Sequence, residues 1–142
     1  YAIEEMDGPT MVDTGLKQAE NFGATLAKET AQNLKQTGDT FTITTDSGSY
    51  EAKYVILTTG ATVNFAEEIG IKTKDGTEPR IKKVIDVDAD GRTSMEGVWA
   101  AGTCAGVSVH AIITAGDGAK VAINIISEMN GERYVDHDIL ES

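Results

Sequence analysis

The residues best suited to chemistry in this chain lie between positions 97 and 118, in the stretch GVWAAGTCAGVSVHAIITAGDG. An apolar segment there predicts a buried strand, small residues follow it, and a helix is expected to begin near Val109. The first amides of a helix lack partners within the helix and favour negative charge, so this junction is suited to an anionic group. Small residues would let a flat, polar, partly anionic ligand reach the main chain; they are Ala100, Ala101, Gly102, Thr103, Ala105 and Gly106. Close packing of the helix on the strand, which also favours Gly and Ala, is the alternative interpretation.

Other side chains in this stretch could react, and each also has a plainer interpretation. Cys104 is either a reactive thiol or a small buried residue of the core. His110 either shuttles a proton or makes a single hydrogen bond at the start of the helix. Ser108 lacks the GxSxG context of a hydrolase nucleophile, and Trp99 is expected in the core.

The sequence predicts no metal site. Asp86, Asp88 and Asp90 have the spacing of calcium ligands in an EF-hand, but the twelfth position is Gly97, which offers no carboxylate. A tight turn at Asp88–Gly91 is the expected structure. With one cysteine and two histidines that lie 27 residues apart, the chain offers neither a cysteine-based metal cluster nor a His-rich metal site.

Composition and charge exclude several classes of partner. The chain has 142 residues and a formal net charge of −11, with its acidic residues scattered, so nucleic acid and anionic membrane surfaces are poor partners. No apolar run approaches the ~20 residues of a membrane span, and no signal peptide is visible. The single cysteine permits neither an intramolecular disulfide nor a CxxC motif, which favours a cytoplasmic protein. The chain begins at Tyr1 without Met, and N-terminal trimming is the expected reason.

The first half of the chain is expected to contain a helix followed by strands. Helical spacing of apolar residues predicts a helix at Met11–Phe22. Two short strands, near Ala24–Lys28 and Ala31–Lys35, are preferred for the next segment, with a helix as the alternative. Alternating apolar residues on both sides of the polar turn Asp46–Ser49 predict a β-hairpin.

The second half is expected to contain buried strands and a long helix. The β-branched run Tyr54–Thr58 and the segment Val98–Ala101 are typical of strands buried on both faces. A short helix at Asn64–Ile69 and a strand at Val84–Val87 are expected between them. The long helix is predicted at Val109–Met129. Its inward face is expected to comprise Ile112, Ile113, Ala115, Ala119, Ala122, Ile123 and Ile126.

Three segments of the chain resemble, in the same order, segments of a known family. In TSMEGVWAAGTCAGVSVHAIITAGDGAKVAINI, a strand and a small-residue turn precede a helix with an Ala-Gly-x-Gly element. AKYVILTTGAT is an apolar strand that ends in a Thr-Gly pair, and GLKQAENFGATL precedes it. Together these motifs resemble the FAD-binding portion of thioredoxin reductase-like oxidoreductases of the pyridine nucleotide-disulfide type. The resemblance covers nearly the whole chain.

The resemblance implies where FAD would bind. The positions that match the family's cofactor contacts are Gly102, Thr103, His110, Ala111, Ile112, Thr59, Gly60, Thr30 and Ala31. The first two stand at the family's contact with the ribityl-phosphate arm, and the next three at the helix start that faces the pyrimidine edge of the flavin. Amides there would stabilise negative charge as an oxyanion hole does. Thr59 and Gly60 match a strand end near the cofactor, and Thr30 and Ala31 match a stretch near the adenine.

The chain also departs from the family pattern. The strand–GxGxxG–helix unit that holds the FAD pyrophosphate is absent. Residues 61–83 are too few to contain the NAD(P)H-binding domain that relatives insert there, and the redox CxxC of that domain is missing too. Thr103 replaces the expected Asp, which exchanges a charged contact with the ribityl arm for a neutral hydroxyl.

These observations predict an α/β fold of the FAD/NAD(P)-binding Rossmann-like type, forming a single, partial FAD-binding domain over residues 1–142. The strands near Ala24, Tyr54–Thr58 and Val98–Ala101 are expected to form a parallel sheet covered by two helices. A small antiparallel side sheet is expected around Asp46–Ser49.

The predicted function is that of an FAD-linked oxidoreductase component that receives electrons from a separate donor protein or from a donor bound directly at the flavin. Two alternatives stay open. One is a non-catalytic remnant or assembly domain that keeps the fold without flavin. The other is a subunit that completes a flavin site with a partner. A homodimer is implied by the resemblance alone.

Overall fold

The computed structural model describes residues 5–135. The chain divides into two compact units, the first ending at Thr30 and the second beginning at Ala31. The first unit contains one helix, α1 (Gly8–Asn21). Asp7 caps it, because a carboxylate oxygen of Asp7 accepts a hydrogen bond from the Thr10 amide at 2.8 Å. With Pro9 in its first turn, the helix starts one turn before the predicted Met11.

The predicted strand at Ala24–Lys28 is wrong. Residues 24–30 form no helix or strand, and the first ladder begins at Ala31, which pairs with Thr45. Residues 24–28 find no ladder partner within the described part of the chain, and a strand without a partner leaves its backbone groups to solvent. The strand predicted at Ala31–Lys35 is confirmed as β1 (Ala31–Thr37).

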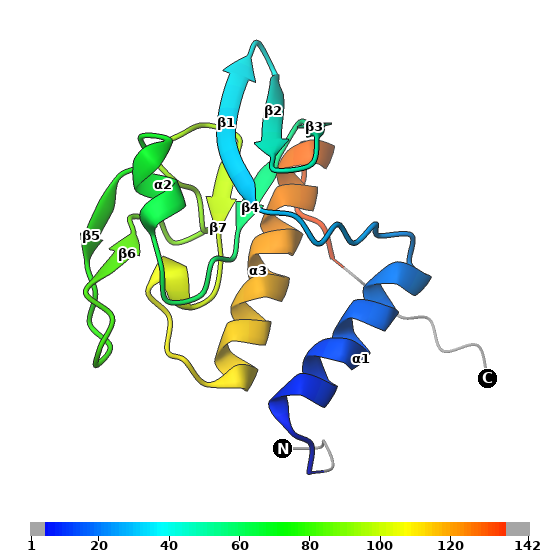
Figure 1. Ribbon diagram of the computed structural model, residues 1–142, viewed down its shortest axis with the longest axis vertical. Coiled ribbons are helices and arrows are strands. Elements are labelled where there is room, and N and C mark those ends of the chain that lie inside the picture. The colour runs from blue at the N-terminus through cyan, green and yellow to red at the C-terminus, as the bar shows by residue number, and fades with distance from the viewer. Residues whose placement is uncertain (1–4, 136–142) are drawn as a thin grey trace. The chain divides into compact units, whose positions relative to one another are not determined.

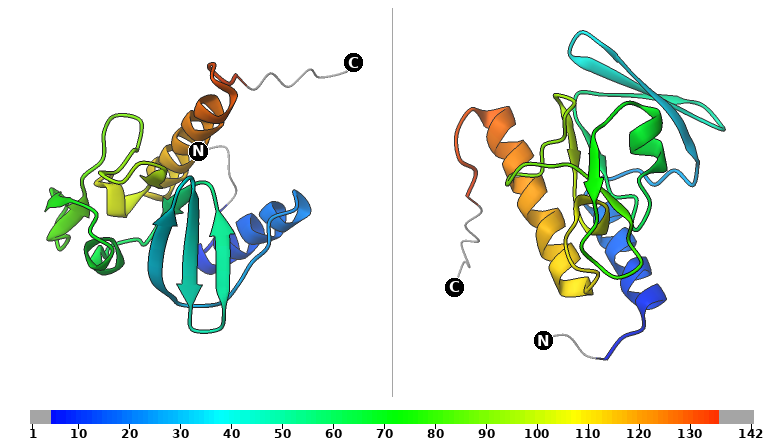
Figure 2. Two further views of the ribbon diagram at one scale, coloured as in Figure 1. Left: turned by 90° about the horizontal axis from the view of Figure 1, so that it is seen from above. Right: turned by 90° about the vertical axis from the view of Figure 1, so that its left-hand side faces the viewer.

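An antiparallel sheet opens the second unit, in the order β1-β2-β3. It contains β2 (Thr40–Thr45) and β3 (Ser49–Ala52), with Ile43 between Leu34 and Tyr50 in the register. The predicted hairpin is confirmed: the Thr45 amide donates to the Gly48 carbonyl at 2.8 Å and closes the turn. Figure 2 shows this sheet as a separate twisted layer.

A parallel pair of strands forms the centre of the second unit (Figure 1). β4 (Val55–Leu57) and β7 (Val98–Ala100) pair in parallel, with Leu57 opposite Ala100. Both strands were predicted, although each ladder is shorter than the apolar run that indicated it. Between them lie α2 (Asn64–Glu68), β5 (Thr73–Asp75) and β6 (Lys83–Ile85); β5 and β6 pair antiparallel. The short polar strand β5 was not predicted.

The long helix is confirmed as α3 (Ala111–Asn130), which follows the turn η1 (Thr103–Ala105). His110 is its N-terminal flanking residue, and Gly131 ends it in the left-handed conformation (φ 70°). α3 packs on β7 through Val121 and Ile125, which join Trp99 and Ala101 in one core cluster. The rest of the core lies on the other side of the pair, around Phe41, Ile85 and Val98.

The predicted inward face of α3 is wrong. Ile112 and Ile113 are 65% and 45% exposed, and Val121 and Ile125 are the buried residues of the helix. Because isoleucines occur on several sides of this helix, apolar periodicity alone did not identify the face that meets β7.

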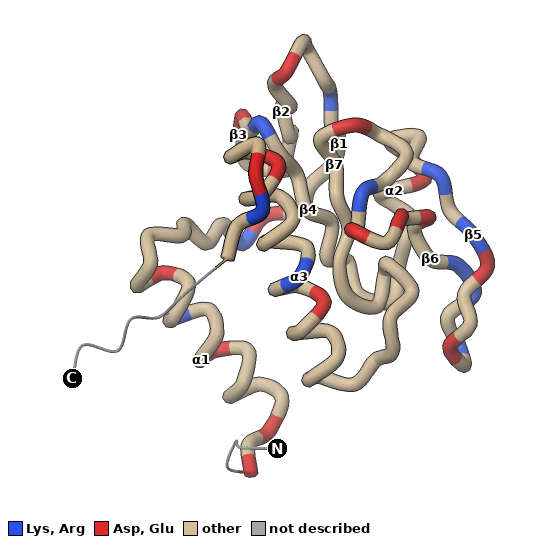
Figure 3. Tube along the Cα trace, turned by 180° about the vertical axis from the view of Figure 1, so that it is seen from behind, with Lys and Arg blue, Asp and Glu red and all other residues tan. Residues whose placement is uncertain are grey.

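Figure 3 shows that basic and acidic positions are interspersed along the described chain. Among the described residues, no helix is both long and apolar enough to cross a membrane.

Candidate functional site

The candidate site is built on the carboxyl ends of β4 and β7. Leu57 of β4 pairs with Ala100 of β7 in the parallel ladder. Gly60 lies three residues after Leu57, and Thr103 lies three residues after Ala100, so both follow the same end of the ladder. The Ala101 amide continues the ladder by donating to the Leu57 carbonyl at 3.1 Å. In open parallel sheets, ligands bind beside this edge. The fold therefore brings the predicted residues Thr59, Gly60, Gly102 and Thr103 to one edge.

The turn η1 leaves two consecutive amides without an acceptor. The Ala105 and Gly106 amides donate to the carbonyls of Gly102 and Thr103. The amides of Thr103 and Cys104 have no hydrogen-bond partner within residues 5–135. Thr103 is half-buried and can offer its amide to an anion or a carbonyl oxygen, whereas Cys104 is buried and its amide is closed to a ligand.

The start of α3 supplies a second pair of such amides. The amides of Ile113 and Thr114 both donate to the His110 carbonyl, at 2.9 and 3.0 Å. Those of Ala111 and Ile112 have no partner in the described part of the chain, and His110 makes no side-chain cap. The α3 macrodipole adds partial positive charge at these amides.

Contacts near both pairs of amides help to define the site. A Cβ placed on Gly102 would lie 3.9 Å from the Thr114 Cβ, so the turn η1 begins against the first turn of α3. Ser108 Oγ lies 2.8 Å from His110 Nδ1. This hydrogen bond occupies Nδ1 and fixes the orientation of the ring, and therefore the direction in which Nε2 points.

At the end of β4, the Thr59 hydroxyl is already used within the chain. It donates to the Thr62 carbonyl at 2.6 Å, and the next residue, Gly60, has a φ of 68°. Thr59 therefore stabilises the turn that ends β4, while its oxygen keeps a lone pair for another donor.

Two predicted residues belong to other parts of the chain. Thr30 ends the first unit, and Ala31 starts β1 in the antiparallel sheet of the second unit. Neither is part of β4, of β7 or of the turns that follow them, and the prediction that they lie near adenine stays a prediction.

Sequence reasoning missed Asp117, in the second turn of α3. Its Oδ2 accepts a hydrogen bond from the Gly102 amide at 2.9 Å, across a sequence separation of 15 residues. The one available signal was an acidic residue among the small and apolar residues of AGDGA.

Cys104 is a core residue. Its side chain is 1% exposed, and its Sγ lies 3.3 Å from the carbonyl oxygens of both Leu57 and Ala101. The plainer of its two interpretations is confirmed, because a reactive thiol needs access to solvent. Trp99 is also 1% exposed and lies in the core, as predicted.

The three aspartates do not converge on one point. Asp86 pairs with Lys74 at 2.9 Å, whereas Asp88 accepts hydrogen bonds from the amides of Asp90 and Arg92, both at 2.9 Å, and closes the predicted turn. Burial alone would raise the pKa of Asp88, but these two amides and the Arg92 charge hold it below its ordinary value. The residues described include no group of three His, Cys, Asp or Glu that could hold a metal ion.

Several solved structures share this fold. The atypical thioredoxin reductase TRi from Desulfovibrio vulgaris Hildenborough is similar over 93% of this chain and 84% of that chain, at 17% identity and a TM-score of 0.78. A thioredoxin reductase from Gloeobacter violaceus is similar over 94% and 80%, at 16% identity and a TM-score of 0.72. A ferredoxin-flavin thioredoxin reductase from Clostridium acetobutylicum is similar over 92% and 81%, at 16% identity and a TM-score of 0.67.

These TM-scores show a common fold of the Rossmann type. The comparison with curated proteins gave no match. The sequence model of the pyridine nucleotide-disulphide oxidoreductases matches residues 11–124. Since this match spans most of the chain, the protein belongs to the pyridine nucleotide-disulphide oxidoreductase family.

Proposed function

We propose that this chain is an FAD-binding oxidoreductase domain of the thioredoxin reductase type, with its flavin site at the carboxyl ends of β4 and β7. The observation that carries the proposal is the presence of free amides from two elements at this edge. The Thr103 amide comes from η1, and the amides of Ala111 and Ile112 come from the start of α3. These three accessible donors, which have no partner among residues 5–135, fit a ligand with phosphate and carbonyl oxygens.

Each group of residues has a role in this proposal. Thr103 offers its amide and its hydroxyl to the ribityl-phosphate arm. Ala111 and Ile112 offer amides to the pyrimidine edge, where the α3 dipole favours negative charge. His110 presents Nε2, because Ser108 engages Nδ1. FAD bound at this edge would supply two-electron redox chemistry.

The sequence also bears on the partners of the reaction. The only cysteine in it, Cys104, is buried, so it cannot exchange disulfides with a substrate. We therefore propose that dithiol chemistry, if the flavin serves it, uses cysteines from another segment or another protein. The electron donor is then a separate protein or a small molecule that binds directly at the flavin.

Two observations favour a second candidate function, that of an assembly domain that keeps the fold without flavin. The Gly102 amide already donates to Asp117, and Thr103 stands where the family resemblance expects Asp. Both features reduce the polar contacts that remain for a cofactor. A subunit whose flavin site is completed by a partner is the intermediate case.

The test is a titration of the full chain with FAD, followed by flavin fluorescence and by the visible spectrum after desalting. The proposal expects saturable binding and a retained flavin spectrum. A folded chain that binds no FAD would refute it and leave the assembly domain, whereas colour that appears only with a partner protein would support a shared site.

A substitution locates the site on η1. Thr103→Asp restores the acidic residue of the family and is expected to tighten FAD binding about tenfold, because a charged acceptor makes the stronger hydrogen bond to a ribityl hydroxyl. Thr37→Asp, on an exposed position of β1, is the matched control for added charge. Equal affinities of the two variants would place the ribityl arm away from Thr103.

A further inference from the structure

Asp117 is a half-buried residue beside the candidate site, and its charged side chain is largely covered. Its side chain is 8% exposed, although α3 is largely exposed at the neighbouring positions. Oδ2 accepts the hydrogen bond from the Gly102 amide at 2.9 Å, and Oδ1 lies 2.8 Å from Lys120 Nζ. A carboxylate is rarely buried to this extent unless it is paired, and here both oxygens are paired.

The contact with Gly102 marks the point at which the chain leaves the sheet. The amide before it, that of Ala101, still donates to Leu57 of β4. Gly102 has φ 80° and ψ −152°, a backbone region that is essentially restricted to glycine. Its amide is therefore directed to Asp117 of α3 instead of to a strand, and the turn η1 begins directly after it.

This arrangement divides the amides of the junction into two sets. Asp117 takes the Gly102 amide, and turn carbonyls take those of Ala105 and Gly106. The amides of Thr103 and Cys104 are left over among the described residues of η1, and only that of Thr103 is accessible, because Cys104 is buried. The orientation of the Thr103 amide depends on the Gly102 conformation, because the peptide planes follow one another along the chain.

We infer that Asp117 is a positioning residue of the flavin site, which holds the Gly102 peptide so that the next amide, that of Thr103, stays available to the cofactor. The inference rests on the proposed function. Asp117 does not touch FAD in this account; it acts through Gly102. Lys120 contributes to the same arrangement. Its ammonium group compensates the negative charge that Asp117 brings close to an anionic ligand.

Three variants separate the hydrogen bond from the charge. Asp117→Ala removes the acceptor and is expected to weaken FAD binding about tenfold. Asp117→Asn keeps an acceptor oxygen and removes the charge, so it is expected to bind FAD at least as tightly as the wild type. Lys120→Gln keeps Asp117 as the acceptor for the Gly102 amide but leaves its negative charge without a counterion. FAD binding is therefore expected to weaken by a few-fold. Glu132→Ala, which removes an exposed carboxylate without a partner among the described residues, is the matched control.

The experiment measures FAD affinity by fluorescence and amide exchange by ¹⁵N NMR on the same full-length samples. Slow exchange of the Gly102 amide is expected in the wild type, Asp117→Asn and Lys120→Gln, and fast exchange in Asp117→Ala. Both Asp117 variants lose the ion pair with Lys120. If Asp117→Asn nevertheless keeps the FAD affinity and the slow Gly102 exchange of the wild type, the defect of Asp117→Ala arises from the lost hydrogen bond and not from a general loss of stability.

Each outcome decides one of the two claims. If the wild type binds FAD and Asp117→Ala binds it equally well, the inference is overturned and the proposed function stands. If the folded wild type binds no FAD, the proposed function fails and the flavin role of Asp117 fails with it. If Asp117→Ala does not fold, the order of affinities decides: Lys120→Gln binding more tightly than Asp117→Asn would overturn the inference.

Discussion

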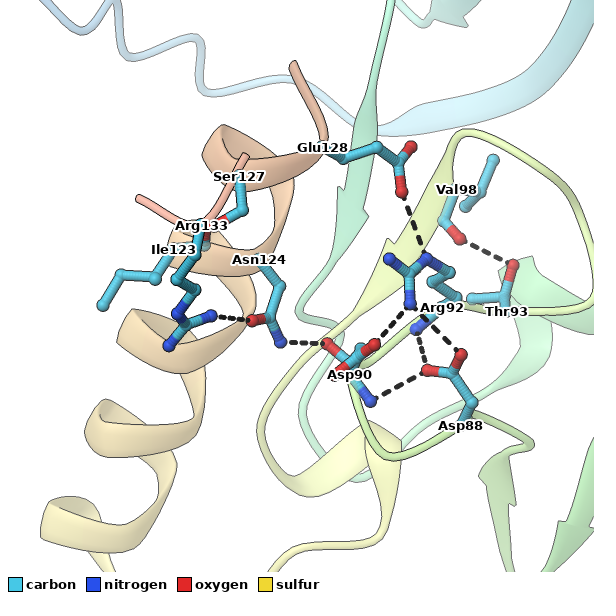
Figure 4. A network of polar contacts seen from close by, with 10 residues as sticks. All are labelled: Asp88, Asp90, Arg92, Thr93, Val98, Ile123, Asn124, Ser127, Glu128 and Arg133. Carbon is cyan, nitrogen blue, oxygen red and sulfur yellow. Dashed lines mark hydrogen bonds and ion pairs between the residues drawn. The ribbon is translucent and has the colours of Figure 1, made fainter. Parts of the chain in front are cut away.

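The guanidinium carbon of Arg92 lies 4.7 Å from the centre of the Trp99 ring. Trp99 is buried in β7, while Arg92 follows the turn that Asp88 closes. Arg92 also pairs with Asp90 and, through Nε at 3.1 Å, with Glu128 near the end of α3 (Figure 4). One side chain thus connects the turn, the central strand and the last turns of α3, away from the candidate flavin site.

This connection predicts a measurable loss of stability in Arg92→Met. The variant loses partly exposed ion pairs and a cation–π contact, each contributing up to about 1 kcal/mol, and the expected cost is about 1–2 kcal/mol. Arg92→Lys is expected to cost less, because it retains a cation. Urea unfolding measures both. Arg80→Met, at an exposed arginine without an ion pair among the described residues, is the control, and an equal cost at the two positions would contradict the prediction.

Gly91 is expected to be much less tolerant of alanine than Gly131. Both have positive φ, 99° and 70°, so alanine costs about 1–2 kcal/mol at either position. A Cβ on Gly91 would also lie 2.6 Å from Cγ2 of Val121, whereas nothing lies within 4 Å at Gly131. Overpacking adds about 1–3 kcal/mol to the cost of Gly91→Ala.

A double-mutant cycle with Val121→Ala checks the cause. If the collision with Val121 is the reason, the free energies of unfolding are not additive, and Gly91→Ala costs less when Val121 is already alanine. Additive costs would show that backbone conformation alone explains the effect at Gly91.

The elements that the sequence predicted well are those whose signals are local. The apolar runs that became β4 and β7, and the apolar spacing that indicated α1 and α3, depend on neighbouring residues only. β5 was missed because Thr73–Asp75 is short and polar and becomes a strand only through its pairing with β6.

The candidate site shows the same division. The order of strand, small residues and helix is a local signal that indicated the junction at Gly102 and Thr103, whereas Thr59 and Gly60 were predicted from the family resemblance. The contact between Asp117 and Gly102 was not predictable, because it depends on the rotation of α3 over β7. Sequence periodicity did not fix that rotation in a helix with isoleucines on several sides.

The pair Glu67–Lys83 predicts a specific dependence on pH. Lys83 Nζ donates to a Glu67 carboxylate oxygen at 2.6 Å, and Thr73 donates to the same oxygen. The Lys83 hydrogen bond, followed by that of Thr73, lowers the pKa of Glu67, and the Glu67 partner raises the pKa of Lys83. The Glu67 contribution to stability is therefore present above its unfolded pKa of about 4.3 and lost as pH falls through the folded value. The Lys83 contribution is present below about 10.4 and lost as pH rises through the folded value.

NMR titration of the Glu67 side chain checks this prediction. In Lys83→Met, the Glu67 midpoint is expected to rise toward the value of the unfolded chain, because its main hydrogen-bond donor is gone. Lys82→Met removes the same charge at the neighbouring position, which is exposed and does not bond to Glu67, and should leave the midpoint unchanged. A midpoint that ignores Lys83 would mean that the pair does not persist in solution.

Two isoleucines on α3 provide the sharpest test of how this helix is oriented. Ile125 is 7% exposed in the core cluster with Trp99, whereas Ile112 is 65% exposed. Ile125→Ala removes buried methyl groups and leaves a cavity, which is expected to cost about 2–4 kcal/mol, while Ile112→Ala is expected to stay within about 0.5 kcal/mol. The substitutions are chemically identical and lie on the same helix, so their unfolding free energies can be compared directly. Equal costs, or a larger cost at Ile112, would mean that α3 presents the face that its apolar pattern indicates, and the contact between Asp117 and Gly102 would then have to be abandoned with that orientation.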